Sequence, residues 1–156
     1  MIIRNRFSTK KGTVISVAVI VFCVVFAILF FLFSKKNNTI RNNNNALNSA
    51  LQNVSSETAT LDDIVPFSWD TAYTFSPYTS IEDMAETMGV DHAGLHESNY
   101  DDMINLVFVK EKAVVASICE HKNNLGYDIE FDTPVAMGDH TIFSIEKRDG
   151  ILYFRR

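Results

Sequence analysis

Two histidines in the middle of the chain have a spacing that can bind metal. His92 and His96 are four residues apart, and Glu97 follows them. On a helix this spacing places both imidazoles on one face, where they can hold a metal ion. However, Gly94 lies between them, and Gly89 is expected to end a helix just before them. We therefore expect a polar loop, and a metal site at His92 and His96 is the alternative.

A cysteine and a histidine form a second candidate pair. Cys119 and His121 are two residues apart in a segment with strand character, so their side chains share a face. A thiolate beside an imidazole can act as a nucleophile. A single cysteine in a strand is more often a small apolar residue, and the sequence offers no third, orienting group. We expect no catalytic residue, and a small cell-surface hydrolase that uses this pair is the alternative.

Three carboxylates form a row with the spacing of one strand face. Asp128, Glu130 and Asp132 alternate with apolar residues. Such rows can bind Ca²⁺ through oxygen ligands, but the glycine and the distal glutamate of an EF-hand loop are missing. We therefore expect the solvated outer face of a half-buried strand, and no metal or other cofactor.

Aromatic residues form a stripe earlier in the chain. Phe67, Trp69, Tyr73 and Phe75 all have odd numbers, so on a strand they would share one face, and Tyr78 follows them. We expect this stripe to form the core beneath a helix. Because tryptophan and tyrosine are favoured in binding interfaces, the alternative is a partner-binding surface formed by Trp69, Tyr73 and Tyr78.

The helix expected to cover this stripe has clear end signals. Ser80 is a good N-cap, and Gly89 suits the position just after the last turn. The apolar residues between them are spaced to form one helical stripe: Ile81, Met84, Ala85 and Met88.

The remainder of the chain alternates apolar and polar residues as strands do. Asp149-Gly150 between two such runs is a strong hairpin signal. We expect the α+β class, with an antiparallel sheet of four to five strands and one packed helix, over residues 61–156. The predicted strands are residues 67–75, 104–110, 113–121, 127–131, 140–147 and 151–155.

An apolar run near the N-terminus has the length of a membrane span. Val14 to Phe33 is a run of 20 residues in which Ser16 is the only polar member. As a helix it would cover about 30 Å, the thickness of the hydrocarbon core. It is longer than the apolar part of a signal peptide and ends without a small-residue cleavage site. We therefore predict an uncleaved transmembrane helix at residues 13–33.

The segments on either side of this helix predict its orientation. Four basic residues precede the apolar run and three follow it, a bias that favours a cytoplasmic tail at residues 1–12. The domain would then be extracellular. Residues 34–60 are predicted to form a linker, because their asparagine-rich stretches offer nothing to bury. Within it, the spacing of Leu47, Leu51 and Val54 is that of a short helix from Ala46 to Val54.

Charge is divided sharply along the chain. Residues 1–45 contain seven basic residues and no acidic one, whereas residues 46–156 have a formal charge of −12. We expect such a domain to repel nucleic acid. The charge suits a basic partner or divalent cations, and solubility alone explains it equally well. We expect a non-enzymatic envelope protein that binds another macromolecule, with a protein of the cell envelope as the expected partner, as an immunity protein, an inhibitor or a subunit of a membrane complex does.

The segment from Trp69 to Thr79 has the pattern W-D-x-x-Y-x-F-x-P-Y-T and precedes a short helix that ends in Met-Gly. It resembles a segment of small secreted or membrane-anchored proteins of Gram-positive bacteria. The resemblance covers about 23 residues of the chain. It implies a location at the cell membrane and no particular activity.

Overall fold

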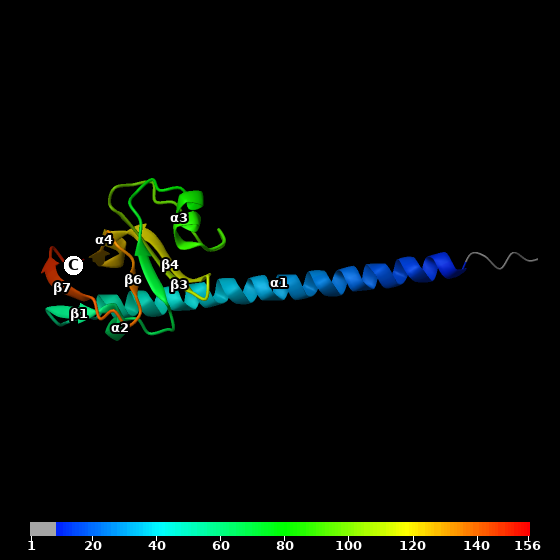
Figure 1. Cartoon of the computed structure of the whole chain (residues 1–156), viewed down its shortest axis with the longest axis horizontal. Helices are drawn as coiled ribbons and strands as arrows, with labels where there is room; N and C mark the ends of the chain where they lie inside the picture. Colours follow the sequence, from blue (N-terminus) through cyan, green and yellow to red (C-terminus); the bar gives the residue numbers. More distant parts are fainter. Residues whose placement is uncertain (1–8) are drawn as a thin grey trace, which may run out of the picture. The chain divides into compact units, whose positions relative to one another are not determined.

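The computed structural model describes residues 9–156 (Figure 1). The chain forms two compact units that meet in sequence at Asn37 and Asn38. Helix α1 (Thr9–Gln52) contributes residues to both units. The first eight residues of the predicted cytoplasmic tail lie outside the described part of the chain.

The N-terminal part of α1 has the character of a membrane span. One helix near the N-terminus is long and apolar enough to cross a membrane. From Val19 to Leu32 every side chain is exposed, so none of these apolar groups is covered by protein. A fully apolar surface of this kind needs an apolar surrounding.

The predicted linker at residues 34–60 is wrong over most of its length. The helix continues to Gln52, and its last part, from Asn38 to Gln52, belongs to the domain, which begins at Asn38 instead of Leu61. Leu47 and Leu51 are fully buried. These leucines are four residues apart, the spacing of one helical face, and their burial fixes the segment in place.

The domain contains two four-stranded sheets. One has the order β1-β7-β8-β5, and the other has the order β4-β3-β2-β6. All pairs are antiparallel except β5 with β8. The elements after α1 are β1 (Thr58–Thr60), α2 (Leu61–Ile64), β2 (Thr71–Thr74), α3 (Ile81–Met88), β3 (Met103–Lys110), β4 (Ala113–His121), α4 (Lys122–Leu125), β5 (Tyr127–Ile129), β6 (Val135–Ala136), β7 (Ile142–Arg148) and β8 (Ile151–Arg155).

The α+β class is confirmed, but two sheets replace the single expected one. Strand β3 shows why, because its six central residues are all buried. Leu106 and Phe108 lie in a large core that contains residues of both sheets. Val107 and Val109 lie in a second core with residues of α3. A strand that is covered on both faces requires a layer on each side, which one sheet and one helix do not supply.

Helix α3 has the predicted ends. The Ser80 hydroxyl accepts a hydrogen bond from the backbone N–H of Asp83 at 3.1 Å. Gly89 ends the helix with φ +64°, a conformation that glycine adopts without strain. Met84, Ala85 and Met88 face the second core as expected.

Asparagine side chains of α1 cover the outer edge of β4. Asn44 pairs with the Ser117 backbone twice: its Nδ2 donates to the carbonyl at 2.7 Å, and its Oδ1 accepts from the N–H at 2.9 Å. Asn43 Nδ2 donates to the Val115 carbonyl at 2.8 Å. An unpaired edge strand exposes backbone groups that must find partners. Here amide side chains take the place of a neighbouring strand.

Two further polar residues of α1 continue this row towards β5. Tyr127 donates its hydroxyl to Asn48 Oδ1 at 2.6 Å. Gln52 Nε2 donates to the Leu125 carbonyl at 2.7 Å. Burial raises the pKa of Tyr127, because the phenolate would lose its hydration. The C-terminal part of α1 thus has an apolar stripe and a polar row, and both contact the domain.

Candidate functional site

The two histidines with metal-binding spacing lie in a loop after α3. Neither His92 nor His96 is in a helix or strand, so the expected polar loop is confirmed and no shared helical face exists. Gly94 between them has φ +88°, and an added Cβ would lie 2.7 Å from Ile40 Cδ1. Buried Leu95 adds to this contact with the second core. The loop therefore packs against the segment of α1 that belongs to the domain.

Cys119 and His121 lie on β4, and only the histidine has an oriented side chain. His121 Nδ1 is 2.9 Å from Asp102 Oδ2, an orienting partner that the sequence did not reveal. Burial and neighbouring Glu120 raise the pKa of the Cys119 thiol, which favours the protonated form. In the described part of the chain, no hydrogen bond joins the thiol to His121. The geometry does not activate this cysteine as a nucleophile.

The aromatic stripe does not lie on one strand face as expected. Strand β2 begins only at Thr71, so Phe67 and Trp69 precede it in irregular chain. Trp69 is 2% exposed in the large core, with its ring edge-on to Phe108 at 5.4 Å. Tyr73 and Phe75 pack against the other core, under α3. The chain that leads into β2 therefore divides the stripe between two cores.

Of the three residues considered for partner binding, Tyr78 is the most accessible. Trp69 is in the core and Tyr73 is half-buried, whereas Tyr78 is 66% exposed. Its φ of +67° is uncommon for a residue with a side chain, and such conformations cluster at functional sites. Tyr78 N–H donates to the Ser98 carbonyl at 2.7 Å, which places its loop beside the segment leading to Tyr100, another exposed tyrosine.

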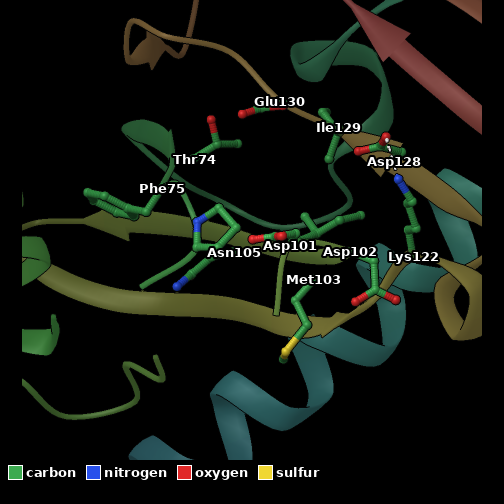
Figure 2. Close-up of a pocket in the computed structure, with 12 residues that line it drawn as sticks. Thr74, Phe75, Asp101, Asp102, Met103, Asn105, Lys122, Asp128, Ile129 and Glu130 are labelled. Carbon is green, nitrogen blue, oxygen red and sulfur yellow. Dashed lines mark ion pairs between the residues drawn. The ribbon is translucent and has the colours of Figure 1, made fainter. Parts of the chain in front are cut away.

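A pocket of about 100 Å³ lies beside these loops (Figure 2). Four carboxylates line it. Asp101 and Asp102 are the two residues before β3, and Asp128 and Glu130 come from β5 and the residue after it. Figure 2 shows the two pairs on different sides of the pocket. Because the pairs are separated by a complete hairpin in the sequence, only the packing of the two sheets brings them together.

The charges in this pocket are only partly neutralised. Asp128 is held by Arg155 at 2.9 Å and faces Lys122 at 3.9 Å. Asp101 and Glu130 have no ion pair or hydrogen bond in the described part of the chain, and both are exposed. The pocket therefore presents net negative charge with two carboxylates available to a ligand.

The sequence pattern identified half of this pocket. Asp128 and Glu130 belong to the predicted row of carboxylates, and exposed Glu130 and Asp132 fit the expected solvated face. Asp128 departs from it, because its side chain is only 14% exposed between its two cationic partners. Asp101 and Asp102 were missed. Their signal was a pair of acids directly before an apolar strand, which is common in loops and therefore weak.

No protein-family model, curated protein or solved structure matches this chain. The resemblance of residues 69–79 to a segment of Gram-positive envelope proteins stays a prediction.

Proposed function

We propose that this chain is a membrane-anchored, non-enzymatic binding protein whose domain holds a basic segment of a protein partner in the acidic pocket. The observation that carries the proposal is the convergence of Asp101, Asp102, Asp128 and Glu130 on one pocket. Fields of one sign attract partners of the other sign and set their orientation. A lysine or arginine side chain could pair with Asp101 and Glu130 without displacing an existing bond.

The exposed tyrosines support an interface at this place. Pro77 and Asp101 line the pocket, and each is the chain neighbour of an exposed tyrosine, Tyr78 and Tyr100 respectively. Tyrosine is enriched in interfaces, and its ring attracts cations. A basic peptide would therefore find both carboxylates and aromatic faces within a few residues of each other.

The anchor and its orientation complete the proposal. The apolar part of α1 would cross the cell membrane once, with residues 1–12 in the cytoplasm and the domain outside. The excess of basic residues before the apolar run supports this orientation. The partner would then be a protein of the cell envelope, and nucleic acid would be repelled by the acidic domain.

A hydrolase that uses Cys119 and His121 is the alternative function. The contact between His121 and Asp102 supports it, because a base held by a carboxylate is a feature of catalytic pairs. The raised pKa of Cys119 counts against it. Cys119→Ala should therefore leave the cellular function intact, and loss of function in a folded variant would favour the hydrolase.

Crosslinking in native membranes tests the binding proposal. A photo-reactive amino acid at Tyr100 in the full-length chain should capture one stoichiometric protein partner. The double variant Asp101→Lys with Glu130→Lys should abolish capture by reversing the charge of the pocket. Glu86→Lys, an exposed change on α3, is the matched control and should leave capture unchanged. Equal capture by all three proteins would exclude the pocket as the binding site.

A further inference from the structure

A second hollow lies beside β2, where its neighbour β6 ends. Strand β6 pairs with β2 only at Thr71 and Ala72, so the following residues of β2 have no strand beside them on that edge. Thr74 Oγ1 instead accepts from the backbone N–H of Phe131 at 3.0 Å and donates to its carbonyl at 2.7 Å. These bonds fix the opposite wall of a pocket of about 290 Å³.

Two aromatic rings form one side of this pocket. Tyr73 and Phe75 both line it, with ring centroids 6.2 Å apart and ring planes only 6° from parallel. Both side chains are half-buried against the core under α3, which holds them in place. The pocket therefore has a preformed aromatic wall that would need little reorganisation to receive a ligand.

The polar groups of this pocket are mostly hydroxyls. Thr79 and Thr87 donate their protons to the carbonyls of Ser76 and Asp83, at 2.8 and 2.7 Å, and keep lone pairs that can accept. The Asp132 carboxylate is exposed and has no partner in the described part of the chain.

Charge narrows the class of ligand for this pocket. None of its described lining residues is lysine, arginine or histidine, so nothing there would pair with a phosphate or carboxylate. Asp132 would repel such an anion, yet as a single carboxylate it can accept two hydrogen bonds from neutral hydroxyls. The pocket suits a ligand that is uncharged and rich in O–H donors.

We infer that this pocket binds a neutral oligosaccharide. A pyranose ring has an apolar C–H face that stacks on aromatic rings, and hydroxyls around its edge. Tyr73 and Phe75 would take the C–H face, while Asp132, Thr79 and Thr87 would accept from the hydroxyls. Aromatic walls with a few placed polar groups are the usual composition of small-ligand sites. This inference is independent of the acidic pocket and of the protein partner proposed for it.

Calorimetric titration of the full-length protein in phosphatidylcholine nanodiscs tests the inference. Nanodiscs avoid detergents with sugar headgroups, which would compete. The probes are cellohexaose, maltohexaose and the hexamer of N-acetylglucosamine, each at millimolar concentrations. At least one should bind, and Tyr73→Leu should weaken that binding by about tenfold through loss of the aromatic wall. Tyr100→Leu, which changes an exposed tyrosine elsewhere, should bind as the native chain does.

If Tyr73→Leu does not fold, two variants of surface residues still test whether the pocket binds the oligosaccharide. Asp132→Asn and Thr87→Val change exposed side chains, and each should weaken binding severalfold without altering the circular dichroism spectrum. Absence of binding by all three hexamers, or unchanged affinity in both surface variants, would overturn the inference. A lysine-rich peptide that binds the native chain and is lost in Asp132→Asn would assign the pocket to a cationic ligand instead.

Discussion

The two parts of α1 share one helical geometry but differ in how their side chains are used. From Val19 to Leu32 the surface is apolar on every side and entirely exposed. From Asn38 to Gln52 the large apolar residues Ile40, Leu47 and Leu51 are buried, and amide side chains bond to β4, α4 and β5. The first pattern suits a uniform apolar solvent, and the second suits one particular protein surface. Helical structure alone therefore does not indicate whether a segment contacts lipid or protein.

Removal of the second part of the helix should have the largest effect on the stability of the domain. A chain that begins at Leu61 lacks Leu47 and Leu51, and each fully buried leucine contributes about 2–5 kcal/mol. Their joint loss is comparable to the whole stability of a typical domain, about 5–15 kcal/mol. We expect this chain to show no cooperative transition in thermal circular dichroism, and a chain that begins at Asn38 to show one. Equal melting of both would mean that residues 38–60 are a linker after all.

A single substitution in each part of α1 should change the free energy of unfolding by less than the truncation does, and the two variants can be compared directly. Leu47→Ala should lower the free energy of unfolding by about 2–5 kcal/mol, because it leaves a cavity in the large core. Val25→Ala, in the exposed apolar part, should leave the unfolding of the domain unchanged. Denaturant titration followed by the fluorescence of Trp69, the one tryptophan, measures both. A similar loss of unfolding free energy in both variants would mean that both parts of α1 contribute to the stability of the domain.

The amide pairing at the edge of β4 predicts a further difference within the second part. Asn44→Ala removes two hydrogen bonds to Ser117 and leaves buried backbone groups unpaired, which costs about 1–3 kcal/mol. Hydrogen exchange at the Ser117 amide should accelerate strongly. The adjacent Asn45 is exposed, and Asn45→Ala should change neither quantity. Slow exchange at Ser117 in the Asn44 variant would mean that another group covers this edge.

Tyr127 gives the smallest effect at neutral pH and a distinct one at alkaline pH. Its raised pKa means that the folded state keeps the phenolic proton after the unfolded state has lost it, above a pH of about 10. Stability should therefore be full below that pH and fall as the pH rises towards the folded-state pKa. Tyr127→Phe should cost about 1 kcal/mol at pH 7, from the lost bond to Asn48, and should remove this alkaline contribution. Unfolding curves at several pH values measure both effects.

Local signals explain which parts of the fold were predictable. Helix α3 follows from Ser80, Gly89 and the apolar spacing between them, all of which act within one short segment. Residues 38–52 were assigned to the linker because their asparagines resemble low-complexity sequence, although Ala46 to Val54 has the spacing of a short helix. Their signal was present in the spacing of Asn44, Asn48 and Gln52, four residues apart on one side of the helix. That spacing becomes informative only when Ser117, Tyr127 and Leu125 are known to lie beside the helix, and the sequence does not show this.

The acidic pocket shows the same limit at the level of the site. The row that contains Asp128 and Glu130 was visible as a strand pattern. Its meeting with Asp101 and Asp102 depends on how two sheets pack, which no local pattern encodes. Trp69 was correctly expected in the core because large aromatic residues are seldom left in water, but its separation from Tyr73 required the actual start of β2.

The position of β8 has a consequence for how the protein is made. This strand follows all the other elements of the domain in the sequence, yet it lies inside its sheet between β7 and β5. Its residues Leu152 and Phe154 share a core with Leu47 and Leu51, about a hundred residues earlier. The first and last parts of the domain to be synthesised must therefore meet before either is stable, which is a slow type of folding. The domain should complete its fold only after β8 has emerged from the ribosome.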